Sequence, residues 1–340
     1  MSKNTPVPAP KGKRRVVRWL FIAVGWGILF VLTAWATAAL RFDLPRASWR
    51  TPVAVIFATA MLCAFIFVKP RWRALSVVAG GFLLVLVWWF TLKPSNTRAW
   101  QPDVAQTAWA EIRGDEVTLR NVRNCDYITE TNYTPRWETR TVRFSKLTGI
   151  DIALTYWGSP WMAHPIVSFQ FADAAPVAFS IETRKEIGES YSAVRGFFRQ
   201  FELIYIVADE RDVIRLRTNY RHGEEVFLYR TKVDAEQARA RFREYIAKVN
   251  ELHERPGWYN ALTANCTTSI RTQRAAAERA PFDWRMILNG KSDEMAYERG
   301  ALAGALPFAE LKRRSLINPR AKAADKAQDF SRAIRADPPW

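Results

Sequence analysis

The sequence is poor in the residues from which metal and nucleotide sites are usually built. It holds 3 histidines and 3 cysteines in 340 residues, and none of them has the short spacing of a zinc site. It has no glycine-rich loop of the kind that binds phosphate groups and no Gly-x-Ser-x-Gly turn of a serine hydrolase. We therefore expect no metal and no cofactor, and we expect neither nucleotide chemistry nor a serine nucleophile.

Acidic residues are also few. The chain has 50 Lys and Arg against 33 Asp and Glu, which gives a net charge of +17. Such an excess is typical of nucleic-acid-binding proteins, but long apolar runs favour anionic phospholipid headgroups as the partner instead. Much of the charge, at residues 11–18 and 312–320, is expected to lie on solvated surface.

Long apolar runs are abundant in the first part of the chain. They lie at residues 19–40, 52–68 and 74–92, and each is long enough to cross the hydrocarbon core of a bilayer as a helix. A cleaved signal peptide would account for the first run only. We therefore predict three transmembrane helices within residues 19–93, with Cys63 as apolar filling in the second helix.

The positive charges around these runs predict an orientation. Residues 1–18 are basic and contain no acid, and they are interpreted as a disordered cytoplasmic tail, because cytoplasmic segments are rich in Lys and Arg. The basic loop 69–73 agrees with this orientation, whereas the arginines of loop 41–51 do not. Three crossings then place everything after Lys93 outside the cytoplasm.

The rest of the chain predicts an α+β domain, an antiparallel sheet with helices packed against it. A linker is expected at 94–110, the folded domain at 111–317 and a surface tail at 318–340. Expected strands are 116–123, two within 139–155, 164–171, 177–184, 201–207, 213–220 and 225–231. Expected helices are 192–200, 234–253, the segment that begins near Cys266 and continues through Ala275–Ala277, 282–288 and 294–305.

One cysteine lies where a turn rich in Asn and Thr runs into a helical pattern. Cys266 stands between Asn265 and Thr267, residue types that favour helix starts. The positive end of the helix dipole favours a thiolate there, and the free backbone N–H groups can stabilise an oxyanion. Cys266 is therefore the predicted nucleophile, with its own N–H and the Asn265 side chain as oxyanion donors. A buried thiol acting as a small hydrophobe is the alternative.

Of the three histidines, one lies in a pattern that suits a base. His222 is in an exposed turn and His253 is at the charged end of a helix, so both are interpreted as solvated surface residues. His164 opens the strand 164–171 after an aromatic turn, and it is the predicted base. A buried structural histidine is the alternative interpretation.

The hairpin that follows His164 supplies an orienting acid. A turn centred near Ala174 sets His164 opposite Arg184, with Glu182 and Ser180 further along the same face. Glu182 is then a diagonal neighbour that can hold the imidazole in one tautomer. The predicted site consists of Cys266, His164 and Glu182 for catalysis, Asn265, Thr267, Ser180 and Arg184 for support, and Tyr205 and Tyr259 as pocket residues. The two tyrosines are more often packing residues.

Two other features are interpreted as non-catalytic. The acidic segment 208–212, with Asp209, Glu210 and Asp212, is interpreted as a solvated turn. Cys125 is interpreted as an unpaired thiol in the early strands. A disulfide between Cys125 and Cys266 is the alternative in an oxidising compartment, and it would exclude the nucleophile.

Several of these segments resemble the Lnb N-terminal periplasmic domain family of bacterial envelope proteins. The resemblance covers about residues 100–335 and is carried by 164–169, 179–184, 189–191, 202–212, 259–260, 265–268 and 329–335. It implies a papain-like fold in permuted order, with the histidine strand before the cysteine helix. It also implies, for at least some members, lipoprotein N-acyltransferase activity. The resemblance places the chain in the bacterial inner membrane, with its C-terminal domain in the periplasm.

The residues and the resemblance together predict a membrane-anchored thiol acyltransferase. Cys266 would attack an ester carbonyl of a phospholipid, and His164 would take the thiol proton and later deprotonate the acceptor amine. The acceptor implied by the resemblance is the N-terminal lipidated cysteine of a lipoprotein. Two alternatives stay open: a cysteine peptidase or amidase that acts on envelope peptides, and a non-catalytic envelope scaffold.

Overall fold

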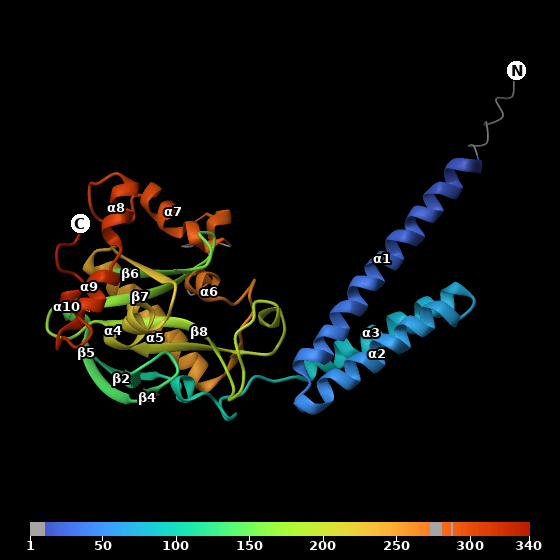
Figure 1. Ribbon diagram of the computed structural model, residues 1–340, viewed down its shortest axis with the longest axis horizontal. Helices are drawn as coiled ribbons and strands as arrows, with labels where there is room; N and C mark the ends of the chain where they lie inside the picture. The colour runs from blue at the N-terminus through green and yellow to red at the C-terminus, as the bar shows by residue number, and fades with distance from the viewer. Residues whose placement is uncertain (1–10, 273–280, 287) are drawn as a thin grey trace, which may run out of the picture. The chain divides into compact units, whose positions relative to one another are not determined.

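The structure, a computed structural model, describes residues 11–272, 281–286 and 288–340. The chain divides into two compact units (Figure 1). The first contains Met1–Lys93 with Phe198–Gln200, and the second contains Pro94–Phe197 with Phe201–Trp340.

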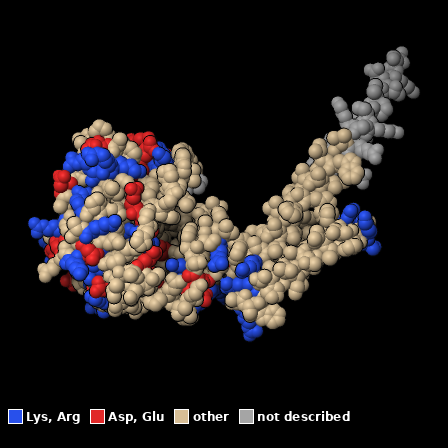
Figure 2. All heavy atoms as spheres, in the orientation of Figure 1, with Lys and Arg blue, Asp and Glu red and all other residues tan. Residues whose placement is uncertain are grey.

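The first unit consists of three apolar helices. They are α1 (Lys11–Asp43), α2 (Ala47–Phe67) and α3 (Arg71–Thr91), and each contains a span long and apolar enough to cross a membrane. Figure 2 shows few charged atoms between the ends of these helices. The three predicted runs are therefore confirmed. The structure differs at the start, because residues 11–18 are helical instead of disordered; residues 1–10 lie outside the described residues.

The three helices approach one another through small side chains. Ala36 and Ala39 of α1 and Ala74 of α3 are fully buried, as is usual where transmembrane helices pack closely. Near the ends of α1 and α3, the indole Nε1 of Trp89 donates a hydrogen bond of 2.7 Å to the Asp43 carboxylate. Cys63 is exposed on α2 and unpaired.

The second unit is built on one large sheet and a small hairpin. The described part of the large sheet has the order β1-β2-β9-β8-β7-β6-β10, with β5 paired to β2 and β11 paired to β9. The bounds are β1 Trp109–Arg113, β2 Glu116–Arg123, β5 Trp137–Arg143, β6 Leu147–Trp157, β7 Ala163–Phe171, β8 Val177–Arg184, β9 Glu202–Ala208, β10 Glu224–Arg230 and β11 Gly257–Trp258. The hairpin joins β3 (Asp126–Tyr127) to β4 (Tyr133–Thr134). Since β2 and β9 run parallel, the sheet is mixed and not purely antiparallel as predicted.

Alternate residues of the central strands enter two different cores, as the period of a strand requires. On one face, Phe169 and Phe179 pack against α5 (Ala235–Glu254). On the other face, Ile166 and Ala178 belong to a core that includes residues of α4 (Glu210–Arg215), α9 (Asn318–Ala323) and α10 (Phe330–Ala333). The sheet is therefore covered on both faces, which confirms the predicted α+β class. The papain-like relationship and its permuted order stay predictions.

Helix α5 has both features that the sequence predicted for it, a cap at Asp234 and a buried apolar stripe. The Asp234 side chain accepts the Gln237 N–H at 2.8 Å and caps the first turn. The residues of the predicted apolar stripe are all buried: Ala238, Phe242, Tyr245, Ile246 and Val249.

Segment 210–220 was predicted as a turn and a strand, and this is wrong. It forms α4 and then a π-helix, Leu216–Tyr220, with Asp209 capping α4 by accepting the Arg211 N–H. Val213 and Ile214 are neighbours and both are buried, so buried and exposed side chains do not alternate as they would in a half-buried strand. The strand-like sequence pattern was therefore misleading. The predicted helix 192–200 is also wrong, because it contains only the 3₁₀ turn Arg195–Phe197.

The helices among the described residues between 260 and 315 are short. They are α6 (Cys266–Thr272), the 3₁₀ turns Trp284–Met286 and Asn289–Lys291, α7 (Ser292–Glu298) and α8 (Phe308–Ser315). The continuation of the Cys266 helix through Ala275–Ala277 lies outside the described residues.

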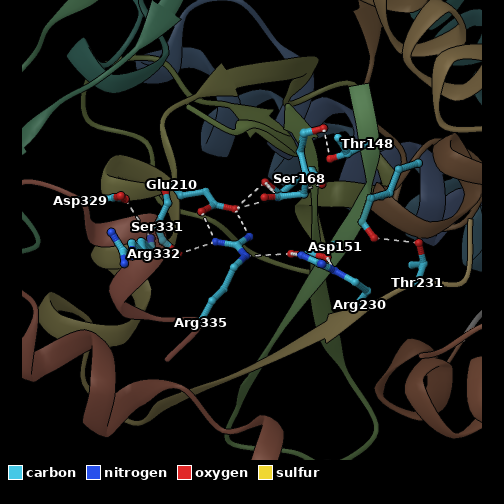
Figure 3. A network of polar contacts seen from close by, with 12 residues as sticks. Thr148, Asp151, Ser168, Glu210, Arg230, Thr231, Asp329, Ser331, Arg332 and Arg335 are labelled. Carbon is cyan, nitrogen blue, oxygen red and sulfur yellow. Dashed lines mark hydrogen bonds and ion pairs between the residues drawn. The ribbon is translucent and has the colours of Figure 1, made fainter. Parts of the chain in front are cut away.

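The C-terminal segment is part of the fold and not the surface tail that was predicted. Phe330 and Ile334 are buried in the core of the sheet. Figure 3 shows Arg335 between two acids: its guanidinium bonds Glu210 at 2.6 and 2.7 Å and Asp151 at 2.9 Å. Both carboxylates are fully buried.

The acids of segment 208–212 are therefore not a solvated turn. Glu210 is held by Arg335, and buried Asp212 accepts from the guanidinium of Arg123 at 2.8 Å. Buried charges are tolerated only when they are paired and hydrogen-bonded in this way. Asp209 is partly exposed and pairs with Arg140.

The predicted linker 94–110 also packs into the second unit. The ring of Trp100 is buried, and the guanidinium of Arg184 lies 4.3 Å from its centroid. Arg184 donates to the backbone carbonyls of Val104 and Ala105 and to the Asn96 side chain. Burial lowers the pKa of Arg184 to about 10. Arg184 therefore fixes the linker and is not the support residue that was predicted.

Candidate active site

Strands β7 and β8 place a histidine and a glutamate opposite each other. Ile166 pairs with Ser180 in the observed register, and continuing that register by two residues pairs His164 with Glu182. The predicted register, with Arg184 opposite His164, is wrong by two residues. Because side chains alternate with a period of two, this shift leaves Ser180 and Glu182 on the face of His164.

A chain of hydrogen bonds fixes the state of the imidazole. Ser180 Oγ donates to Glu182 Oε1 at 2.6 Å, and it lies 2.7 Å from His164 Nε2. A hydroxyl has a single proton, so Ser180 Oγ must accept from the Nε2–H. Glu182 Oε1 is itself 3.2 Å from Nε2. His164 therefore carries its hydrogen on Nε2, which leaves Nδ1 as the nitrogen able to act as a base.

A buried arginine pairs with the glutamate of this cluster. Arg217, on the π-helix, donates to Glu182 at 3.0 Å and to Glu224 at 3.3 Å. The side chain of Arg217 is 6% exposed, so its charge acts with little screening by water. Sequence reasoning missed it because it placed Arg217 in a strand.

The charges of this cluster shift the pKa values of both Glu182 and His164. Burial by itself would raise the pKa of Glu182, but the charges of His164 and Arg217 hold that pKa well below its ordinary range. Burial also acts to lower the pKa of His164, and Arg217 acts in the same direction. The charge of the Glu182 carboxylate and the hydrogen bonding of the ring with the Cys266 thiol and Glu182 together outweigh these two effects, so the pKa of His164 is raised.

The thiol stands at the first residue of α6. Cys266 is partly exposed and free, and its side chain is within hydrogen-bonding reach of the His164 ring. Part of its surface packs against the core that contains α5. The structure therefore brings Cys266, His164 and Glu182 together, although they are far apart in the sequence.

Asn265 caps the start of this helix. Its Oδ1 accepts the N–H groups of Thr267 and Thr268 at 3.0 and 2.9 Å, the pattern of a helix cap. Its Nδ2 donates to the carbonyl of Ala261 at 2.7 Å. Asn265 therefore caps α6 and positions Cys266. Its Nδ2 carries a second hydrogen, so its role as an oxyanion donor stays a prediction.

A different asparagine, which sequence reasoning missed, reaches the thiol. Asn289 Nδ2 lies 3.7 Å from Cys266 Sγ and donates to Thr267 Oγ1 at 2.9 Å. Its Oδ1 accepts the N–H of Ala163, the neighbour of His164, at 2.9 Å. Asn289 thus ties the histidine strand to the cysteine helix. The Asn-Gly dipeptide at 289–290 signals a turn, but no sequence pattern indicates that the turn faces Cys266.

The residue after Asn289 must be glycine because of close backbone packing. A Cβ on Gly290 would lie 2.4 Å from the carbonyl oxygen of Pro160 and from the carbonyl carbon of Trp161. The Gly290 N–H donates to Trp161 O at 3.0 Å, and its carbonyl accepts from the Tyr156 hydroxyl at 3.0 Å. This contact fixes the turn before His164 against the turn that carries Asn289.

We expect Gly290→Ala to destabilise the second unit by about 1–3 kcal/mol, because two backbones must separate to admit the methyl group. Native-state hydrogen exchange of β6 and β7 amides measures this effect. Gly149→Ala is the matched control, since a Cβ there meets only the Val233 carbonyl at 3.9 Å. Equal protection in the two variants would contradict this role of Gly290.

The two predicted pocket tyrosines have different surroundings. Tyr205 is buried in the core and packs edge-on against Tyr245, so its assignment to a pocket is wrong. Tyr259 is 9% exposed. It lies near Cys266 and is hydrogen-bonded to Tyr191, and burial raises its pKa above the ordinary value.

The other cysteine and histidines lie in different environments. Cys125 is fully buried and unpaired. Burial raises the pKa of its thiol to about 11, so it is inert at neutral pH. His253 is not a solvated residue as predicted, because it stacks on Trp109 and hydrogen-bonds Thr107 at 2.7 Å. His222 lies in a turn before β10, as expected.

The family model of the Lnb N-terminal periplasmic domain matches residues 133–290. This confirms the resemblance over a shorter range than the predicted 100–335, and segment 329–335 lies outside the match. The matched range contains His164, Glu182, Cys266 and Asn289. No curated protein and no solved structure gives a significant match. The chain thus combines three helices that are long and apolar enough to cross a membrane with a segment of its second unit, residues 133–290, that matches the Lnb N-terminal periplasmic domain family.

Proposed function

We propose that the protein is a membrane-anchored thiol acyltransferase. The observation that carries this proposal is the cluster of Cys266, at the first residue of a helix, with His164 and Glu182. A nucleophile, a base and a residue that orients the base are the parts required for covalent acyl transfer.

In the first half-reaction, His164 Nδ1 takes the proton of the Cys266 thiol, and the thiolate attacks an ester carbonyl of a phospholipid. The carbonyl oxygen gains the negative charge, and when the tetrahedral intermediate collapses the C–O ester bond breaks. The lysophospholipid leaves with the proton from His164. The product is an acyl thioester on Cys266.

In the second half-reaction, the N-terminal amine of a lipoprotein attacks the thioester. His164 takes a proton from the amine, the C–S bond breaks, and the Cys266 sulfur recovers that proton. The acceptor leaves as an amide. Glu182, held by Arg217, stabilises the imidazolium that forms in both steps.

Two donors are suited to the oxyanion. The Cys266 N–H lies in the first turn of α6 and has no acceptor among the described residues. Asn289 Nδ2 has one hydrogen on Thr267 and its second available near Cys266 Sγ. Donors of this kind lower the barrier when they face the charge that develops in the transition state.

The proposal includes a location and a topology. The chain would lie in the bacterial inner membrane with a cytoplasmic N-terminus, which the basic segment 1–18 and loop 69–73 favour. The catalytic domain would then face the periplasm. Phospholipid donor and lipidated acceptor would both be concentrated at that membrane surface.

Intact-protein mass spectrometry after incubation with phospholipid tests the chemistry. We expect an adduct of acyl mass that neutral hydroxylamine removes and that Cys266→Ala lacks. Cys63→Ala is the matched control and should keep the adduct, since Cys63 is exposed in the middle of the apolar helix α2 and does not belong to the cluster of His164 and Glu182. If no adduct forms but Cys266 reacts with thiol reagents, the chemistry is that of a peptidase or amidase. An unreactive Cys266 without an adduct indicates the scaffold.

A further inference from the structure

Exposed large apolar side chains of the second unit are concentrated near Cys266. Among the described residues of this unit, all of them except Ile112 and Ile128 lie in four segments. These are the turn 157–162, the loop 187–197, Leu262, and the group Phe282, Trp284 and Leu288. We call these four segments the apolar rim. Phe282 and Leu262 are 65% and 58% exposed, which is costly in water unless something covers them.

Two of these segments are joined to each other and to the thiol. The rings of Trp161 and Trp284 lie 6.4 Å apart, centroid to centroid. The carbonyl of Trp161 accepts the Gly290 N–H, and the neighbouring Asn289 reaches Cys266 Sγ. The aromatic turn before β7 and the Trp284 turn therefore form one apolar surface that adjoins the thiol.

The other two segments adjoin the thiol through the loop before α6. The Ala261 N–H donates to the Gly196 carbonyl at 2.8 Å, which fixes the loop 187–197 beside Leu262. A Cβ on Gly196 would lie 3.2 Å from the Tyr259 ring, so these segments are closely packed. Asn265, the residue before Cys266, donates to the carbonyl of Ala261.

The composition of the rim favours a lipid surface over another protein. Trp and Tyr are enriched where a protein meets the headgroup region, because their rings have an apolar body and a polar edge. Lys185, Arg195 and Lys291 lie in or next to the same segments, and Lys291 Nζ is 5.8 Å from the Trp161 ring. Apolar side chains with neighbouring cations are the pattern that binds anionic membrane surfaces. The same chain has three helices that are long and apolar enough to cross a membrane, and these would keep the second unit next to a bilayer.

We propose that the apolar rim inserts into the surface of the bilayer that anchors the chain, so that Cys266 opens onto lipid. This deepens the proposed function, on which it rests for the phospholipid substrate, by giving the acyl chain a path to the thiol without crossing water. The insertion itself requires no chemistry at Cys266.

Fluorescence quenching in proteoliposomes tests the insertion on the full chain. An environment-sensitive label is attached to Leu262→Cys or to Trp284→Cys in a Cys63→Ser, Cys266→Ser background, in which the remaining Cys125 is buried. The vesicles contain phosphatidylethanolamine and phosphatidylglycerol, with or without doxyl-labelled lipid. Ile128→Cys is the matched control, because Ile128 is 71% exposed and lies outside the rim.

We expect the emission of the labels at 262 and 284 to shift to shorter wavelength and to be quenched by doxyl lipid, unlike the label at 128. Equal quenching at all three positions would overturn the proposal. A shift without lipid quenching would also overturn it, because a second copy or another protein then covers the rim. Because this background lacks Cys266 and cannot form a thioester, the result on membrane insertion does not depend on whether the proposed acyl transfer is correct.

Discussion

The variant His164→Gln is expected to form the acyl adduct about 10²–10⁴-fold more slowly than the unchanged protein, the range that general acid–base catalysis contributes. Glutamine can keep a hydrogen bond to Ser180, but it cannot take the thiol proton. The rate constant of adduct formation, followed by intact mass at saturating phospholipid, measures the loss.

The matched control for this experiment is His253→Gln, which removes a histidine that stacks on Trp109 in the same unit. It should form the adduct at the unchanged rate. The pH dependence of thiol alkylation provides a second readout, since loss of the imidazole partner should move the onset of Cys266 reactivity to higher pH. An unaltered adduct rate in His164→Gln would remove histidine from the proposed mechanism.

Loss of the guanidinium in Arg335→Met is expected to destabilise the second unit by about 3–5 kcal/mol, the usual cost of leaving a buried charge without its partner. Glu210 is fully buried and holds two bonds to Arg335. Asp151 keeps Arg230 after the change, so the cost arises chiefly at Glu210. Hydrogen exchange of β6, β7 and α10 amides in the full chain measures the local free energy of opening.

The same variant predicts a pH dependence with a definite sign. Burial acts to raise the pKa of Glu210, but the charge of Arg335 holds it below its ordinary value of 4.5. A carboxyl with a lowered pKa stabilises the fold above that value, and this stability is lost as the pH falls through its pKa in the folded state. The unchanged chain keeps this contribution down to about pH 4.5, whereas in Arg335→Met burial acts on Glu210 without the opposing charge and raises its pKa, so that Glu210 becomes neutral on folding at a higher pH. The difference between Arg335→Met and the unchanged chain should therefore shrink as the pH is lowered from 7 toward 4.5.

Arg332→Met is the matched control for Arg335→Met. Arg332 lies on α10, three residues before Arg335, and is exposed; exposed surface substitutions usually change stability by less than about 0.5 kcal/mol. If the local free energy of opening falls by the same amount in both variants, Arg335 does not stabilise the fold through the buried acids.

The apolar runs, the main strands and the helix cap at Asp234 could be predicted from the sequence because each depends on local periodicity or on one turn. A run of apolar residues determines a membrane span whatever its neighbours are. The segment 177–184 alternates in a way that only a strand satisfies. Cys266 and His164 were found by similar local arguments, because a helix start and a strand start are visible in the chain.

Only the tertiary structure decided the residues that act across long separations. Asn289 reaches the thiol because Gly290 lets two backbones meet, and Arg217 reaches Glu182 because a predicted strand is a helix on the sheet face. Buried acids such as Glu210 resemble a solvated turn until their partner, far away in the sequence, is placed beside them. Local patterns therefore determined the apolar helices and pointed to Cys266 as the candidate nucleophile, whereas charge pairing and backbone contacts between distant segments determined the surroundings of that thiol.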